Sequence, residues 1–371
     1  MFDTLLKART QIEELRDEFG SAFGRVMRSG EFIGGSEVMA LEKELAEFCQ
    51  NDYCIACARY HDALEMLLRV NGIGDDEEVI LPAIGPLGMA HAVSWIGATP
   101  RFVDVSPRDL TINPEEISKA INSRTRAIVV LHLYGFPCAM EEIVEIADAH
   151  DLILIEDISH GVGGTIGSVP LGNFSHAALI RFSPGLSLGA YGEAAAVLTR
   201  DDGIARRVSM LANQGRFGNS DEVFIAGTDS RMSEINAALL RTKLHRQEMW
   251  INKRRALVQL YQTYLAGMDL EILQPRADVD PVLASVPVLT KEIGAALRFL
   301  NRKGWGAGVA MPSLLPMLRC YKTQGYRERD FPVAVESMKT LLPLPLAAEM
   351  VRLDVEEICE GVQREIASVG K

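Results

Sequence analysis

LIRFSPGLSLGAYG, from Leu179 to Gly192, joins the end of an apolar strand to a turn that contains a proline and several glycines. We predict a strand over residues 177–182 that turns immediately afterwards. An earlier stretch, DLILIEDISHG over residues 151–161, predicts a second apolar strand that ends at Asp157. Because ligands bind beyond the carboxyl ends of strands in open parallel sheets, we expect Asp157 and the 183–188 turn to face one pocket.

Short apolar strands alternate with helical segments over residues 53–198. The predicted strands are YCIACA (53–58), EEVILP (77–82), PRFVDV (100–105), RAIVVL (126–131) and LILIED (152–157). Their apolar residues are continuous, which is typical of a mostly parallel sheet with helices on both faces. A dinucleotide-binding Rossmann unit would need Gly-x-Gly-x-x-Gly after a strand, and these strands are not followed by one.

The segments on either side of this region are mainly helical, because their apolar residues recur at spacings of three and four. We predict one long or two short helices over residues 3–28, a helix over 37–48 capped by Ser36, two helices over 230–267, a strand over 284–289, and helices over 291–303 and 355–369. The chain is therefore predicted to be an α/β protein. Its large domain would span residues 1–245, and a smaller C-terminal α/β domain would span residues 246–371.

The composition limits the class of protein. With 371 residues, 48% of them hydrophobic, the chain can form two domains with their own cores. A net charge of −12 argues against a surface for nucleic acid or an anionic membrane. The chain has neither a membrane-spanning apolar run nor a signal-peptide pattern, so we expect a cytoplasmic protein. Among the six cysteines only Cys54 and Cys57 form a close pair, which predicts reduced thiols and no metal site.

Two motifs carry a resemblance to a known family. Glu156, Asp157 and His160 match the pattern Glu-Asp-x-x-(Gln/His), and residues 188–192 match Leu-Gly-x-(Tyr/Gly)-Gly. Both patterns resemble those of the DegT-type (DegT/StrS) family of pyridoxal-phosphate sugar aminotransferases. The resemblance in sequence extends over essentially the whole chain. The resemblance implies the fold-type-I aminotransferase fold and a homodimer whose site is built from both subunits. It also implies a biosynthetic pathway, such as one for antibiotics or surface glycans.

The sequence departs from that family at the position of its Schiff-base lysine, which is Leu186 here. Leucine can neither form an imine nor accept a proton, so covalent attachment of the cofactor is excluded at this position. The nearest lysines along the chain are Lys119 and Lys243.

The phosphate-binding segment also differs, because Arg59, Tyr60 and His61 stand where the family has Ser-Gly-Thr. Arg181 replaces a serine of the family. Asp229 replaces the asparagine that, in the family, reaches across from the partner subunit.

These residues define the predicted site. His61, Asp157 and His160 are the candidates for acid–base catalysis near neutral pH. The candidates for substrate binding are Arg59, Tyr60, Arg181, Ser183, Tyr191 and Asp229. Two arrangements are open: the arginines bind an anionic group of the substrate, or Arg59 or Arg181 pairs with Asp229 and closes the pocket.

The sequence thus favours an aminotransferase-like protein that works without pyridoxal phosphate or any other cofactor. We expect it to use the pocket that holds the cofactor in the family for acid–base chemistry. The reaction would be an isomerisation, dehydration, cyclisation or condensation of a small biosynthetic intermediate, which could be anionic. The alternative is a non-catalytic partner or regulator of an active aminotransferase paralogue. A sugar aminotransferase or dehydratase dependent on pyridoxal or pyridoxamine phosphate is the third, less favoured reading.

Overall fold

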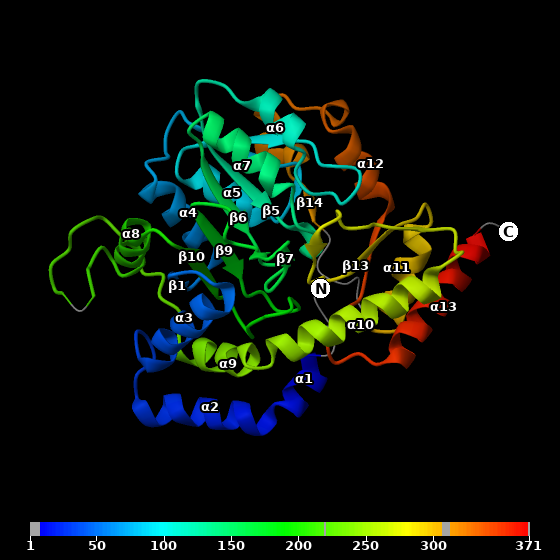
Figure 1. Ribbon diagram of the computed structural model, residues 1–371, viewed down its shortest axis with the longest axis horizontal. Helices are drawn as coiled ribbons and strands as arrows, with labels where there is room; N and C mark the ends of the chain where they lie inside the picture. The colour runs from blue at the N-terminus through cyan, green and yellow to red at the C-terminus, as the bar shows by residue number, and fades with distance from the viewer. Residues whose placement is uncertain (1–7, 219, 306–311, 370–371) are drawn as a thin grey trace.

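A seven-stranded sheet forms the centre of the protein (Figure 1), and its strand order is β1-β10-β9-β6-β5-β2-β4. The computed structural model describes residues 8–218, 220–305 and 312–369. The strands are β1 Tyr53–Cys57, β2 Glu78–Pro82, β4 Thr99–Val103, β5 Thr125–Leu131, β6 Ile153–Asp157, β9 Ala177–Arg181 and β10 Ala195–Thr199. β10 is antiparallel to both of its neighbours, and the other adjacent pairs are parallel. The predicted α/β fold with a mostly parallel central sheet is confirmed.

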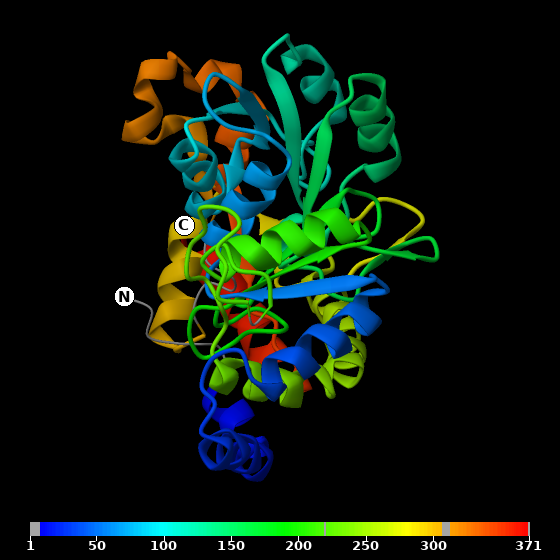
Figure 2. The same cartoon turned by 90° about the vertical axis from the view of Figure 1, so that its left-hand side faces the viewer.

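Alternate residues of each strand enter separate cores on the two faces of this sheet. In β5, Ala127 and Val129 pack in the core that includes α4 and α5, whereas Ile128 and Val130 pack against α6 and α7. Helices therefore cover both sides of the sheet (Figure 2), which explains why the strands are apolar throughout. These helices are α3 Ser36–Cys49, α4 Tyr60–Val70, α5 Leu87–Trp95, α6 Pro114–Ala120, α7 Met140–Ala149 and α8 Asp202–Ala212.

A second, smaller sheet lies in the C-terminal part of the chain. It consists of β11 Glu271–Ile272, β13 Val286–Leu289 and β15 Leu341–Leu344, and its neighbours are antiparallel. The helices of this part are α11 Ile293–Arg302, α12 Pro332–Thr340 and α13 Arg352–Val369. Two consecutive helices, α9 Glu234–Leu244 and α10 Gln247–Leu265, lead into it (Figure 1). The predicted domain boundary at residue 245 falls between them and stays a prediction.

Short elements complete the fold. They are β3 Ile84–Gly85 paired with β14 Ser313–Leu314, β7 Thr165–Ile166 paired with β8 Val169–Pro170 and β12 Val279–Asp280, and the 3-10 turns Leu133–Gly135, Leu315–Met317, Arg319–Gln324 and Glu328–Asp330. The carboxylate of Asp104, just after β4, accepts the backbone N–H groups of Val333 and Ala334, both at 2.9 Å. This interaction fixes the start of α12 to the central sheet.

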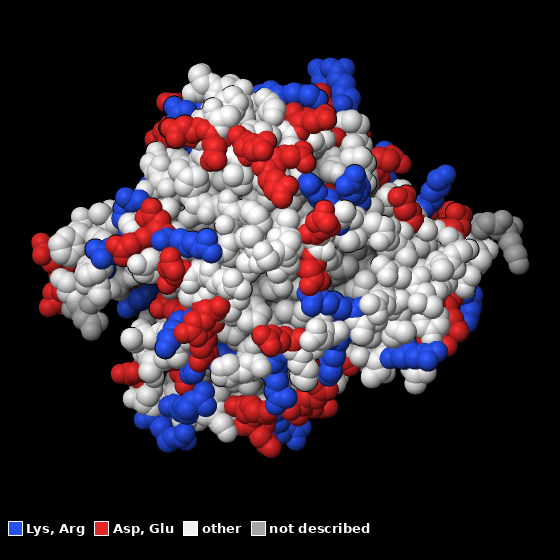
Figure 3. All heavy atoms as spheres, viewed as in Figure 1, with Lys and Arg blue, Asp and Glu red and all other residues white. Residues whose placement is uncertain are grey.

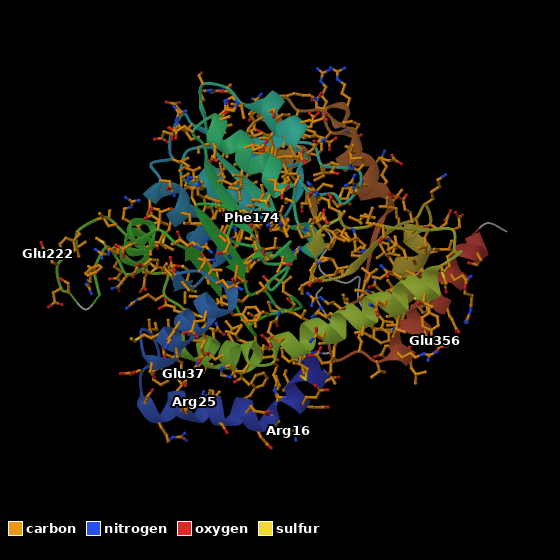
Figure 4. The ribbon with its side chains drawn as sticks, in the orientation of Figure 1. Arg16, Arg25, Glu37, Phe174, Glu222 and Glu356 are labelled. Atoms are coloured by element: carbon orange, nitrogen blue, oxygen red, sulfur yellow. The ribbon has the colours of Figure 1, made fainter. Side chains whose placement is uncertain are left out.

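The N-terminal region forms two helices, α1 Ala8–Glu14 and α2 Arg16–Ser29, which is one of the two predicted alternatives. α2 packs on α9 through Ala22 and Val26. Arg25 of α2 points toward Glu37 of α3 (Figure 4), with 2.6 Å between Nε and Oε1. Ion pairing and apolar contact therefore both hold these helices against the large domain.

The predicted capping role of Ser36 is wrong. Ser36 is the first residue of α3, and its side chain makes no capping bond. The buried carboxylate of Glu234, at the start of α9, accepts the N–H groups of Gly35 at 2.8 Å, Glu37 at 2.7 Å and Val38 at 3.2 Å. A residue distant in sequence therefore supplies the negative charge that favours a helix N-terminus.

The surface carries charges of both signs, and Lys and Arg are interspersed with Asp and Glu over the face seen in Figure 3. Within residues 8–218, 220–305 and 312–369, no helix combines the length and the apolar composition needed to cross a bilayer.

Substitution of Glu234 by alanine is expected to destabilise the protein strongly. It would leave three N–H groups at the start of α3 without an acceptor, and hydrogen bonds to a charged group contribute about 1.5–3 kcal/mol each. We expect the free energy of unfolding in urea to fall by about 3 kcal/mol or more. Glu145→Ala, on the exposed side of α7, is the matched control. Equal stability of the two variants would contradict the capping role.

Candidate functional site

The carboxyl ends of β6 and β9 lie side by side and place two of the predicted site residues next to each other. Asp157 is the last residue of β6 and pairs with Leu179 of β9, while Arg181 is the last residue of β9. The Asp157 carboxylate is 1% exposed. Its Oδ1 accepts the backbone N–H of Ser159 at 2.9 Å and a very short bond from the Ser159 hydroxyl. The same hydroxyl accepts the backbone N–H of Arg181 at 2.8 Å, so one serine joins both strand ends.

The neighbouring motif residue, Glu156, faces the opposite side of the sheet, as the alternation of a strand requires. Its buried carboxylate accepts hydrogen bonds from the backbone N–H groups of Gly172 and Phe174 and from the Ser175 hydroxyl, the last at 2.8 Å. The carboxylate also lies 3.1 Å from His132 Nε2. These bonds fix the 172–175 loop to β6. Glu156 therefore has a structural role, and Asp157 is the motif residue that faces the site.

Two buried polar atoms near Asp157 have no hydrogen-bond partner in the described part of the chain, namely His160 Nε2 and Arg181 Nε. A third polar atom, the Tyr60 hydroxyl, faces the Asp157 carboxylate. A buried polar group without a partner costs about 1–3 kcal/mol, so two such atoms at one place indicate a site that a polar ligand completes.

His160 is arranged as a hydrogen-bond donor. The backbone N–H of Tyr134 donates to His160 Nδ1 at 3.0 Å, so in the neutral ring the proton resides on Nε2. Burial, and secondly the positive charge of Arg181, lower the pKa of His160 to about 3, which keeps the ring neutral. A role as general base, as predicted from the sequence, would require the bond from Tyr134 to break.

Tyr60 is the first residue of α4, and its side chain extends toward Asp157. The residue is 3% exposed, and the Cζ atom of Arg181 lies 5.9 Å from the ring centroid. Burial raises the pKa of the Tyr60 phenol well above its ordinary value, and the nearby Asp157 charge raises it further. Tyr60 therefore stays protonated.

Arg59 and Asp229 do not pair with each other. Arg59 Nε lies 3.1 Å from Asp62 Oδ2, which also accepts the Ser230 hydroxyl at 2.6 Å. Asp229 pairs with Arg231, with 3.0 Å between Oδ1 and Nε. Within one chain, therefore, the arginine–aspartate pair that could have closed the pocket is not formed through Arg59.

His61 packs away from β6, on the side of α5. Its ring stacks on Trp95 with 5.5 Å between centroids and on His91 with 6.4 Å. Burial and the neighbouring His91 lower the pKa of His61, which favours the neutral ring at pH 7. His61 is thus able to accept a proton, but from a position different from that of His160.

The turn over residues 182–190 is held by its own backbone. The N–H of Leu186 donates to the carbonyl of Ser183 at 3.2 Å, and that of Ala190 donates to Phe182 at 2.8 Å. A Cβ atom at Gly189 would lie 2.7 Å from the Ser183 oxygen, so this close approach requires glycine.

A small cavity of about 30 Å³ lies beside this turn, and Leu186, Tyr191 and Lys243 are among the residues that line it. Lys243 Nζ donates a very short bond to the Gly189 carbonyl and lies 4.1 Å from the Tyr191 ring centroid. The Tyr191 hydroxyl donates to Gln11 at 2.9 Å. Asp157 is not among the residues that line this cavity, and a pocket shared by the turn and Asp157 stays a prediction.

Lys243 is the residue near Leu186 that sequence reasoning missed, because it lies more than fifty positions further along the chain and reaches the turn from α9. The one available signal was its place within the apolar face of a predicted helix, between Leu240 and Leu244. Ser159 was missed for another reason: a serine between two motif residues has no pattern of its own.

The mostly parallel sheet with a second small sheet matches solved structures of aminotransferases, which have the fold of type I. Residues 13–363 match the model of the DegT/DnrJ/EryC1/StrS aminotransferase family, and the chain belongs to this family.

Relatives and solved structures agree with this assignment. The chain is 33% identical to the dTDP-3-amino-3,4,6-trideoxy-alpha-D-glucose transaminase of Streptomyces venezuelae, over 96% of this chain and 94% of the relative. It is 32% identical to the dTDP-3-amino-3,6-dideoxy-alpha-D-galactopyranose transaminase of Aneurinibacillus thermoaerophilus, over 94% and 95%. The structure of S. venezuelae DesV in complex with a ketimine intermediate superposes with a TM-score of 0.91 and 32% identity, over 96% of both chains.

These comparisons overturn two predictions. The predicted function, an enzyme independent of pyridoxal phosphate or a non-catalytic partner, is wrong because the relatives are named sugar transaminases. The predicted absence of a cofactor is also wrong. The relatives at 32–33% identity are named transaminases, and the DesV structure, which is 32% identical, contains a ketimine intermediate. The prediction gave too much weight to the missing lysine amine at position 186. It gave too little to Asp157 and His160, which match the family pattern.

The donors around Asp157 fit the ring and the phosphate of this cofactor. A buried carboxylate suits the protonated ring nitrogen, His160 Nε2–H suits the ring hydroxyl, and the first turn of α4 has free N–H groups for a phosphate. Leu186 has no amine, so the site does not fit a covalent link there.

The pH dependence of stability is expected to report the buried state of Lys243. Burial lowers the pKa of Lys243 from 10.5 to about 7, so between these values the unfolded chain binds more protons than the folded one. Stability contributed by this residue is therefore lost as pH falls toward 7 and increases as pH rises toward 10. We expect this increase to be smaller in Lys243→Met, measured by urea unfolding between about pH 7 and pH 10. The exposed Lys253→Met, on α10, should behave as the wild type, and a Lys243→Met curve parallel to it would contradict the assignment.

Proposed function

We propose that this protein is an enzyme of sugar biosynthesis that binds a pyridoxal-phosphate-type cofactor, in its pyridoxamine form, without a covalent link to residue 186. The observation that carries the proposal is the pair of buried, unpartnered polar atoms around Asp157, His160 Nε2 and Arg181 Nε, at the carboxyl ends of β6 and β9. An apolar filling of this space would leave their cost uncompensated, whereas a polar, anionic ligand would satisfy them.

Each of these residues has a defined part in holding the ligand. Asp157 supplies a fixed negative charge, because Ser159 holds its carboxylate in one orientation. His160 donates from Nε2 and stays neutral, so it adds no charge next to Arg181. Arg181 and the first turn of α4 supply positive potential for a phosphate. When bound, the pyridinium ring of such a cofactor acts as an electron sink for the substrate carbon next to the amine.

The substrate class we propose is a nucleotide-linked keto or amino sugar. The support comes from the relatives, two of which are named transaminases of dTDP-linked deoxyamino sugars. The position of Arg59 is consistent with an anionic substrate. Its side chain is 58% exposed at the start of α4, and its guanidinium can bind a phosphate while it stays paired with Asp62. A cytoplasmic location stays a prediction from the sequence.

We also propose a homodimer, as the family resemblance implies. The loop between α8 and α9 projects from the large domain (Figure 1) and exposes Phe217, Val223 and Phe224, each more than half exposed. Apolar side chains grouped on a projecting loop are typical of a surface that a second subunit covers. The same loop region carries Asp229, one of the predicted substrate-binding residues.

The first test is binding of pyridoxamine phosphate to the purified protein, measured by calorimetry and by native mass spectrometry, which also reports the dimer. We expect one cofactor per chain. Asp157→Asn should weaken binding by about tenfold or more, because a hydrogen bond to a charged group contributes about 1.5–3 kcal/mol. The exposed Asp148→Asn, on α7, should bind as the wild type does. Absence of binding by the wild type would overturn the proposal.

The second test concerns residue 186. Borohydride reduction of wild-type protein mixed with pyridoxal phosphate should leave residues 182–190 unmodified, because leucine cannot form an imine. In Leu186→Lys we expect the cofactor mass on the peptide that contains residue 186, since the backbone of the turn does not depend on that side chain. Wild-type protein labelled by the cofactor at Lys243 would show that another lysine has taken over the covalent role.

A further inference from the structure

The side chain of Tyr60 spans the two points between which the proposed cofactor would have to lie. Tyr60 is the first residue of α4, where a phosphate would bind. The hydroxyl of its side chain reaches the Asp157 carboxylate. A buried carboxylate suits the protonated ring nitrogen of the cofactor, so that nitrogen would face Asp157. A six-membered aromatic ring that belongs to the protein therefore occupies the line between the helix N-terminus and the aspartate.

The space around this ring is closely filled. Tyr60 is 3% exposed, Arg181 lies over one part of its ring, and the ring of His61 makes an edge contact at 6.4 Å. On the side of α5, a Cβ atom added to Gly88 would lie 3.2 Å from Tyr60 Cδ1, so the backbone of α5 is in contact with the ring. A second aromatic ring cannot enter beside Tyr60 at these distances.

We propose that Tyr60 occupies the ring position of the site when no ligand is bound, and that the cofactor must displace the Tyr60 side chain to reach Asp157. This inference rests on the proposed function, and it makes Tyr60 the residue that sets the affinity and the specificity for the ring. It also assigns a role to a residue that replaces the glycine of the family's Ser-Gly-Thr segment.

The contact between the Tyr60 hydroxyl and Asp157 makes this displacement an exchange of partners. The hydroxyl faces the carboxylate in the free protein, and the ring nitrogen of the cofactor would take over that contact, whereas packing of the Tyr60 ring is lost. If only a fraction of the molecules has Tyr60 displaced, the apparent dissociation constant of the cofactor increases by the reciprocal of that fraction.

The test compares the affinity for pyridoxamine phosphate of the wild type, Tyr60→Ala and Tyr60→Phe. Tyr60→Ala removes the ring and is expected to bind at least about tenfold more tightly than the wild type. Tyr60→Phe keeps the ring but loses the contact of the hydroxyl with Asp157, and is expected to bind with an affinity between those of the wild type and Tyr60→Ala. Tyr53→Phe is the matched control, since Tyr53 begins β1, at the opposite end of the sheet from Asp157, and is partly exposed.

A measurement on the wild type does not depend on the folding of Tyr60→Ala. Nitration of tyrosines, mapped by peptide mass spectrometry, should be low at Tyr60 in the free protein and should increase when pyridoxamine phosphate is saturating. Tyr261, fully buried in the core, should stay unmodified in both states. Protection of Tyr60 that persists with bound cofactor would overturn the inference.

The outcomes separate this inference from the proposed function. Equal affinities of the wild type and Tyr60→Ala would overturn the role of Tyr60 and leave the proposed function intact. Binding by Tyr60→Ala alone would support the role of Tyr60 and overturn the cofactor proposal for the natural protein. Absence of binding in all variants, each folded by its melting temperature, would overturn both.

Discussion

The hydroxyl of Ser159 is the interaction on which the site depends. It donates to Asp157 and accepts the backbone N–H of Arg181, and so fixes the end of β6 to the end of β9. Without it, the buried Asp157 carboxylate would lose its orientation and part of the hydrogen bonding that compensates its burial. Tyr60, His160 and Arg181 can act together on one ligand because the Asp157 carboxylate among them has a fixed orientation.

Stability and function are separated between two adjacent acidic residues. Glu156 is fully bonded on one face of the sheet, while Asp157 and its neighbours keep unpartnered atoms on the other. Proteins tolerate unsatisfied buried groups where binding needs them, and the cost is offset by complete hydrogen bonding elsewhere. This arrangement also explains why one motif can contain a structural and a functional carboxylate.

The fold was predictable from the sequence, but the site only in part. Continuous apolar strands predicted the central sheet, and the motif around Asp157 pointed to the sheet edge at which the buried unpartnered atoms lie. Ser36 misled because a capping residue was sought nearby, whereas Glu234 reaches the helix from α9. Lys243 was missed, and the packing of His61 on Trp95 was not foreseen, because both depend on contacts between elements that local patterns do not encode. The cofactor was misjudged because one side chain outweighed the rest of the site.

The turn that carries Leu186 is fixed by bonds in which the side chain at position 186 takes no part: two within its own backbone and one from Lys243 to the Gly189 carbonyl. The path of the chain there is thus independent of the residue that would perform covalent chemistry. In evolutionary terms, an exchange between leucine and lysine at this position leaves the backbone hydrogen bonds of the turn in place. The architecture therefore allows covalent and non-covalent cofactor binding on the same backbone.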